Sequence, residues 1–178
     1  MASADETPDG PVWFPLSSNM AERTHTYRIS NRWTGNLGSG TATYRGYSRD
    51  FELEGAGKVL PVRCSSDPYF RGDKARYNTE ELLVGCLSGC HMLWVLHLCA
   101  DAGIVVTEYR DEATGEMVEH ADGAGEFVRV TLHPRMTIAD AARIDDALAL
   151  HDRAHEMCFL ARSMNFPVGH EAEVKAAE

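Results

Sequence analysis

The chain has 178 residues, 44% of them hydrophobic and 25% charged, which suits one globular domain with its own core and is too short for two comfortable domains. The formal net charge is -10 and the 17 Lys and Arg residues are scattered, which argues against a nucleic-acid-binding groove and favours a small neutral or anionic ligand. Five cysteines is an odd number and no secretory leader pattern is seen, so we expect a cytoplasmic protein with reduced thiols.

The predicted plan is an arm, one domain and a tail. Residues 1–22 are rich in Pro, Ser, Asp and Glu and are expected to form an irregular arm that docks through Trp13 and its apolar neighbours. Residues 23–170 are predicted to form a single α+β domain, and residues 171–178 a loose polar tail. The domain begins with short stretches of strand character separated by glycine-rich turns, at 26–33, 40–47, 50–53 and 59–63.

A long helix follows, with Asn78 and Glu81 in the positions of a capping box and Gly103 as the stop. The run from 82 to 98 is apolar nearly all round, but Ser88 and two histidines interrupt it and it is short for a membrane span, so we expect a buried helix and no membrane partner. Such a helix must be covered on several sides, by a sheet and by a second subunit. A central helix in a monomer is the alternative.

The second half of the chain is predicted to contain two strands and a helix. Residues 104–110 and 127–132 alternate apolar with polar residues and are expected to form an antiparallel pair, with turns at 114–115 and 123–125. The second helix is expected to begin between Thr137 and Asp140 and to end near residue 165, before Pro167.

Cys90, in the middle of the first predicted helix, is a candidate reactive thiol. Buried in apolar surroundings it would be inert unless a cation favoured its thiolate. The loop before the helix offers Arg71, Lys74 and Arg76, and we select Arg71, held by Glu80, which lies about 80° and about 15 Å from Cys90 on the same helix. The alternative is that these charges only solvate a loop, and Arg76 is the competing choice.

Cys158, on the second predicted helix, is a candidate resolving thiol that would attack a sulfenic acid formed at Cys90. An isolated cysteine at such a position is more often a small core residue. A second alternative is a metal site made of His151, His155 and Cys158, which share one stripe of the helix, although the spacing fits no standard zinc module. Cys64 and Cys99 are interpreted as packing residues, and Cys86 as core rather than a rival resolver.

Two separated motifs carry a family resemblance. The central helix of the OsmC and organic hydroperoxide resistance family resembles the run YNTEELLVGCLSGCHMLWVLHLCADAGIVVTEY, in which Glu80 and Cys90 keep the family spacing. The family segment with the resolving cysteine is similar to AHEMCFLARSMNFPV, which places that role on Cys158, and a family loop with an active-site arginine is similar to SSDPYFRGDKARYN, which favours Arg71. The likeness spans roughly residues 41–168. Thr79 and Phe159 stand where proline is usual.

The resemblance implies an α+β intertwined homodimer, with curved antiparallel sheets around two central helices and active sites between the subunits. It also implies a thiol peroxidase that reduces organic hydroperoxides, and hydrogen peroxide less well, with Cys90 attacking and Cys158 closing a disulfide. A dithiol or other thiol would reset the pair without metal, haem or flavin. Apolar lining from Met92, Leu93 and Trp94 would favour organic peroxides. The alternative function is a non-catalytic dimeric binder of an apolar small molecule.

Overall fold

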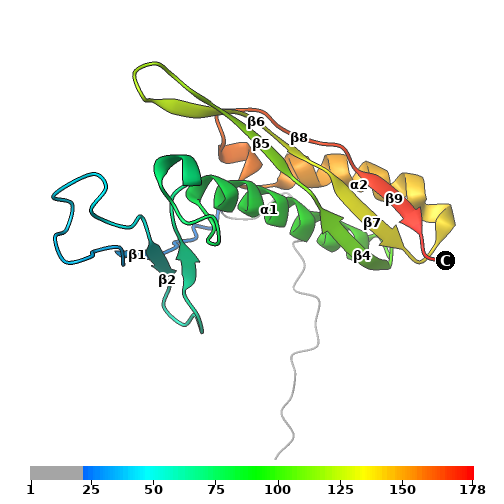
Figure 1. Ribbon diagram of the computed structural model, residues 1–178. Coiled ribbons are helices and arrows are strands. Elements are labelled where there is room, and N and C mark those ends of the chain that lie inside the picture. Colours follow the sequence, from blue (N-terminus) through cyan, green and yellow to red (C-terminus); the bar gives the residue numbers. More distant parts are fainter. Residues whose placement is uncertain (1–21) are drawn as a thin grey trace, which may run out of the picture.

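The computed structural model describes residues 22–178, which form an α+β fold of nine strands, two α-helices and three short 3-10 helices. A small sheet at the N-terminal side stands apart from a body in which long strands run over both helices (Figure 1). The predicted fold class is therefore confirmed. The arm predicted for residues 1–22 lies almost wholly outside the described residues.

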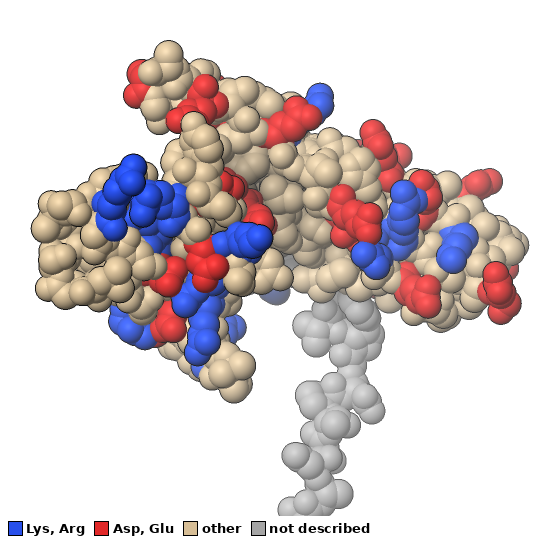
Figure 2. Space-filling model, viewed as in Figure 1, with Lys and Arg blue, Asp and Glu red and all other residues tan. Residues whose placement is uncertain are grey.

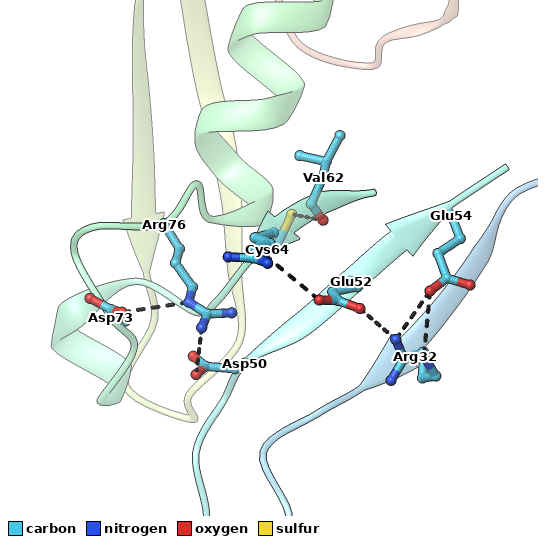
Figure 3. A network of polar contacts seen from close by, with 9 residues as sticks. Arg32, Asp50, Glu52, Glu54, Val62, Cys64, Asp73 and Arg76 are labelled. Atoms are coloured by element: carbon cyan, nitrogen blue, oxygen red, sulfur yellow. Dashed lines mark hydrogen bonds and ion pairs between the residues drawn. The ribbon is translucent and has the colours of Figure 1, made fainter. Parts of the chain in front are cut away.

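The N-terminal sheet contains β1 (Ser30–Trp33), β2 (Phe51–Glu54) and β3 (Val62–Cys64), all antiparallel. Arg32 of β1 pairs across the strands with Glu52 and Glu54, which fixes the register from the exposed face (Figure 3). The strands predicted at 26–33, 50–53 and 59–63 are each present in shortened or shifted form.

The strand predicted at residues 40–47 is absent, because these residues form turns. Gly40 adopts a φ of 56°, which turns the chain away from an extended path. The Arg49 guanidinium lies 4.4 Å from the ring centre of Tyr44 and 4.1 Å from that of Tyr47, and it donates to the carbonyls of both residues. The aromatic residues that suggested a strand therefore fold around one arginine instead.

Helix α1 (Thr79–Asp101) begins as predicted. The Asn78 side chain accepts from the Glu81 N–H at 2.7 Å, and the Glu81 carboxylate accepts from the Asn78 N–H at 3.0 Å. Gly103, with a φ of 67°, follows its end. The buried residues of α1 form one stripe, namely Leu87, His91, Val95 and Cys99. Cover by a sheet and by a second subunit was expected from the sequence, and the cover by a second subunit stays a prediction.

The other faces of α1 are only partly covered. Leu93 is 64% exposed, and Cys86 on the same side is exposed as well. Among residues 22–178, α1 is the one helix whose length and composition would allow it to cross a membrane, a property that core helices of soluble proteins share. An apolar helix with a single buried stripe requires further cover.

The body carries two three-stranded sheets, β5-β6-β8 and β4-β7-β9. The chain runs from one sheet into the other three times, and each of these three segments is called a path. Strands β4 (Val106–Asp111) and β5 (Thr114–Glu119) lie on the first path, and β6 (Gly125–Leu132) and β7 (Pro134–Ile138) on the second. The predicted pairing of 104–110 with 127–132 is wrong, because β4 pairs with β7 and β5 with β6. The turn expected at 114–115 belongs to β5, and the reversal lies at Gly123.

The bend between the two sheets is held by Asp111. One carboxylate oxygen accepts from the His133 N–H at 2.7 Å, and the other accepts from the Ser88 hydroxyl of α1 at 2.5 Å. The His133 ring lies 3.4 Å from the Glu171 carboxylate on the third path. The break in the strands is thus tied both to α1 and to the C-terminal segment.

Helix α2 (Ile144–Met157) is shorter than predicted at both ends. Thr137 lies in β7, and Asp140 caps the short turn η2 (Ala141–Arg143) that precedes the helix. Cys158 comes directly after α2 in an extended conformation, with φ -67° and ψ 110°, and a second short turn, η3 (Ala161–Ser163), follows. Its thiol is therefore presented by the end of the helix and not by a helical face.

The C-terminal residues are ordered in the sheets, and the prediction of a loose tail at 171–178 is wrong. Strand β8 (Val168–His170) lies parallel to β6, and β9 (Glu173–Ala176) lies parallel to β7. Val174 packs against the core cluster that contains Val95, Met136 and Ala154. The alternation of apolar and charged residues in β9 was the available signal.

Candidate active site

The two cysteines selected from the sequence come together at the end of α2. Cys158 is 1% exposed, whereas Cys90 in the middle of α1 is half-buried. Burial raises the pKa of the Cys158 thiol well above its usual value, and the interaction with the neighbouring Cys90 thiol raises it further. The Ala161 N–H, 3.5 Å from the Cys158 sulfur, acts in the opposite direction. The fold therefore assembles a thiol pair from two distant segments.

The two thiols differ in access. A small molecule can reach the half-buried Cys90, while the main chain of the 158–161 turn and the core cover Cys158. No disulfide joins any of the five cysteines, all of which lie in the described part of the chain. Cys64 and Cys99 are fully buried, which confirms their interpretation as packing residues, whereas Cys86 is exposed and its placement in the core is wrong.

The surface beside Cys90 is apolar. Trp94, one turn further along α1, meets Phe159 edge to face, with ring centres 5.6 Å apart. Phe159 and Leu93 are each 64% exposed, so this apolar surface is open in the single chain. Phe159 comes directly after Cys158, and its side chain thus joins the two cysteine-bearing segments.

Arg71 and Glu80 lie apart from the thiol pair in this chain. Arg71 ends the turn η1 (Pro68–Phe70) in the left-handed conformation, with a φ of 69°, and is exposed. Glu80 accepts from the Thr79 hydroxyl at 3.0 Å. Within residues 22–178, no hydrogen bond or ion pair joins Arg71 to Glu80, or either of them to Cys90. Four residues were selected from the sequence as a site. Within a single chain, only the two cysteines among them lie close together.

Glu80 instead lines a cleft of about 560 Å³ at the start of α1. Its lining combines carboxylates, including Glu81, Asp111 and Glu112, with apolar residues such as Val84 and Phe127. The cleft therefore offers both acidic and apolar contacts.

Arg76, the competing arginine, forms ion pairs with two carboxylates close to the N-terminal sheet. Its guanidinium lies 3.4 Å from Asp50 and 3.5 Å from Asp73 (Figure 3). It also faces Cys64, where burial raises the thiol pKa and the Arg76 charge lowers it in part. Arg71 is thus the arginine of this loop that is left available for a ligand or another surface.

A cluster of four histidines lies between α1, α2 and β8, and sequence reasoning missed it. His91 Nε2 is 3.1 Å from His151 Nδ1, and the His170 ring centre lies 5.1 Å from that of His91 and 5.6 Å from that of His155. Only the spacing of His151 and His155 was visible in the sequence, because His91 and His170 come from other elements. His170 also pairs with Asp152 at 3.3 Å.

The histidines at the centre of the cluster are held neutral. Burial lowers the His91 pKa to about 3 and the His151 pKa to about 4, and the neighbouring histidines add to the shift. His91 Nδ1 and His151 Nε2 have no hydrogen-bond partner among the described residues. The pair therefore uses one nitrogen of each ring for its mutual hydrogen bond and leaves the other unsatisfied.

The geometry does not favour a metal site. In the described part of the chain, no group of three or more His, Cys, Asp or Glu side chains is arranged to hold a metal ion. His151 meets His91, the His155 ring lies tilted against the His170 ring, and Cys158 meets Cys90. The three residues of the metal hypothesis therefore face different partners.

Charge is divided between the two parts of the molecule. Residues 22–77 carry ten Lys and Arg against six Asp and Glu, whereas residues 78–178 carry seven against 18. Figure 2 shows basic side chains gathered on the N-terminal unit at the left and acidic ones over much of the body. The exposed Arg71 lies on the basic side, and the cleft lined by Glu80 on the acidic side.

Comparisons with known proteins agree with the resemblance in the sequence. The family model described as OsmC-like protein matches residues 72–173, more than half of the chain. No curated protein matches the chain.

Solved structures of this group have the same fold. An OsmC-like protein of unknown function from Vibrio cholerae is 26% identical, with a TM-score of 0.75, over 84% of this chain and 100% of that one. An organic hydroperoxide resistance protein OsmC from Legionella pneumophila is 16% identical, with a TM-score of 0.62, over 86% and 99%. A putative organic hydroperoxide resistance protein from Vibrio cholerae, with captopril bound in one of its active sites, is 17% identical, with a TM-score of 0.58, over 86% and 95%.

Proposed function

The chain belongs to the OsmC-like family, and from this membership we propose that it is a thiol peroxidase that reduces organic hydroperoxides to alcohols. The observation that carries the proposal is the pair of an accessible Cys90 and a buried Cys158, assembled by two different helices. Similar solved proteins are named organic hydroperoxide resistance proteins, which supports the same reaction class.

The first chemical step belongs to Cys90. Its sulfur, as the thiolate, attacks the outer oxygen of the hydroperoxide, the S–O bond forms and the O–O bond breaks. The departing alkoxide takes a proton and leaves as the alcohol, so the peroxide is reduced and Cys90 is oxidised to the sulfenic acid. The half-buried position of Cys90 gives a small substrate access to this sulfur.

Cys158 then resolves the sulfenic acid. Its sulfur attacks the Cys90 sulfur, the S–S bond forms, and the S–O bond breaks with release of water that carries the Cys158 proton. Its high pKa keeps Cys158 as the thiol until this step, so it does not compete for peroxide. A dithiol or other thiol reductant, which the reaction requires as co-substrate, returns both cysteines to thiols by two exchange steps.

The apolar surface around Cys90 supports organic hydroperoxides as the preferred substrates. Leu93, Trp94 and Phe159 offer aliphatic and aromatic contact to the carbon chain of such a substrate. Hydrogen peroxide has no apolar part to gain from these contacts. Comparable rates with cumene hydroperoxide and hydrogen peroxide would therefore argue against this preference.

The proposed active form is a homodimer. Outside its buried stripe, helix α1 leaves apolar side chains half-buried or, like Leu93, exposed, and a second copy would cover them. Arg71 is exposed and makes no ion pair with residues 22–178, and the acidic residues 78–178 of one copy are complementary in charge to the basic residues 22–77 of another. In this arrangement the partner copy is the source of the arginine that favours the Cys90 thiolate.

One experiment tests the proposal directly. The reduced protein is treated with one equivalent of cumene hydroperoxide and analysed by intact mass and peptide mapping, with the Cys90→Ser and Cys158→Ser variants alongside. We expect a disulfide between Cys90 and Cys158, a trapped sulfenic acid in Cys158→Ser, and no reaction in Cys90→Ser. Cys99→Ser, at a buried cysteine outside the pair, is the matched control and should react like the unaltered protein. Unchanged thiols would refute the proposed peroxidase activity and favour a non-catalytic binder of an apolar molecule.

A further inference from the structure

The histidine pair between the two helices is the feature of the molecule that the proposed reaction leaves unexplained. His91 and His151 are almost completely buried, at 1% and 0% exposure, and each ring leaves one nitrogen without a partner among the described residues. Two apolar side chains of similar size would fill the same space without unsatisfied groups. What the imidazoles add is one directional hydrogen bond of 3.1 Å between α1 and α2.

This hydrogen bond joins the two elements that present the thiols. His91 is the residue next to Cys90 on α1, and His151 lies two turns before Cys158 at the end of α2. On a helix, adjacent side chains are about 100° apart around the axis, so the direction of His91 fixes the direction of Cys90. A rotation of α1 by about 20° would move an atom 5 Å from the axis by about 2 Å.

Disulfide formation is sensitive to a displacement of that size. The sulfur atoms must approach to about 2 Å with a restricted dihedral angle, and the Cβ atoms to about 4 Å. Apolar packing between helices is not directional and tolerates small rotations, whereas a hydrogen bond between two rings weakens when they turn. The contact therefore restrains the rotation on which the approach of the two sulfurs depends.

We propose that His91 and His151 form a positioning pair whose hydrogen bond holds Cys90 in register with Cys158 for disulfide closure. The pair touches no substrate, and it acts on the second step of the proposed reaction and not on the first. The proposal rests on the proposed function for its biological role, but the register of the two thiols is a property of the chain that is measured separately.

The surroundings support this assignment. The His170 ring of β8 is tilted against His91, with ring centres 5.1 Å apart, and stacks on His151 at 6.1 Å, while the Tyr109 ring of β4 stacks on His151 at 6.3 Å. The rings are thus confined on several sides, and the hydrogen-bonded orientation is held by packing.

The test uses the full chain with His91→Leu, which removes the hydrogen bond and keeps an apolar side chain, and His91→Gln, whose terminal amide reaches the position of the bonded nitrogen. His120→Leu, at the exposed β5–β6 turn, is the matched control. Three quantities are measured: the equilibrium of the Cys90–Cys158 disulfide in a glutathione redox buffer, the rate of sulfenic acid formation in a Cys158→Ser background, and the unfolding temperature.

We expect His91→Leu to lower the equilibrium constant for disulfide closure at least tenfold, to change sulfenic acid formation less than twofold, and to leave the unfolding temperature unchanged or higher. His91→Gln should recover most of the closure. Unchanged closure in His91→Leu would overturn the proposal, as would equal losses in both steps or failure of Gln to do better than Leu. The glutathione equilibrium needs no peroxide. Absence of sulfenic acid would therefore refute the peroxidase, while the measured closure of the disulfide would still decide whether His91 and His151 position the two thiols.

Discussion

At the scale of single residues, the environments of the two thiols support the roles proposed for them. Cys158 is enclosed by the core and the turn that follows α2, and burial raises its pKa, whereas the half-buried Cys90 opens on an apolar surface. The sequence predicted both cysteines, from the helix that carries Cys90 and from the family resemblance. It could not predict the histidine pair, because His91 and His151 are 60 residues apart and only the packing of α1 on α2 brings them together.

The two arginines of the loop before α1 should respond differently to substitution. Arg71→Met should slow sulfenic acid formation about 100-fold, because a donor that stabilises the thiolate and the peroxide oxygen is lost. Stability should not change, since Arg71 makes no ion pair with the described residues. Arg76→Met should lower the free energy of unfolding by about 1 kcal/mol, because it loses Asp50 and Asp73, and leave the rate unchanged. Stopped-flow peroxide kinetics and urea unfolding check both, and the reverse pattern would move the role to Arg76.

At the scale of elements, the ends of a helix could be predicted where residues close in sequence satisfy its backbone N–H and C=O groups. The start and end of α1 could be predicted because Asn78, Glu81 and Gly103 act within a few residues of one another. The start of α2 could not be predicted in this way, because Thr137 belongs to β7 and is hydrogen-bonded to a strand about 30 residues earlier in the sequence. The same holds for β5, whose Thr114 and Gly115 have turn propensity but pair with β6.

The capping box of α1 should contribute measurably to stability. Asn78→Ala removes the side chain that accepts from the Glu81 N–H, and should lower the free energy of unfolding by about 1 kcal/mol. Asn165→Ala, at an exposed residue outside the helices, is the matched control and should have little effect. Urea unfolding monitored by far-ultraviolet circular dichroism measures both variants. Equal free energies of unfolding for Asn78→Ala and Asn165→Ala would mean that the cap does not contribute measurably to stability.

At the scale of the whole molecule, the fold class and the thiol pair were predictable, but the arrangement of the sheets was not. The alternation in β9 was present in the sequence, yet this short charged strand has no partner nearby in the sequence and pairs instead with the distant β7. The buried histidines are likewise a property of the assembled body, and they make its stability depend on pH.

The protein should lose stability as the pH falls below about 6.5. His91 and His151 have folded-state pKa values of about 3 and about 4, below the unfolded value of 6.5, so the unfolded chain binds more protons in between. The free energy of unfolding should therefore decline by several kcal/mol from pH 6.5 towards pH 4. Urea unfolding at a series of pH values measures this slope.

A variant with His91→Leu and His151→Leu provides the control for the pH series. It lacks the two groups that titrate on unfolding, so its decline over the same range should be clearly smaller. The remaining slope includes the contribution of His170 of β8, whose pKa is also lowered by burial. Parallel curves for the two proteins would show that the pair does not control acid stability.

The position of β9 has a consequence for shortened forms of the chain. A polypeptide ending at residue 170 would retain both helices and both thiols, because neither depends on the last eight residues for its contacts within the pair. It would, however, leave one side of β7 with unpaired backbone N–H and C=O groups and would uncover the core beneath Val174. The outer strand of this sheet is β9 itself, and its exposed Glu173 and Lys175 disfavour pairing with strands of other molecules, so its removal should increase aggregation.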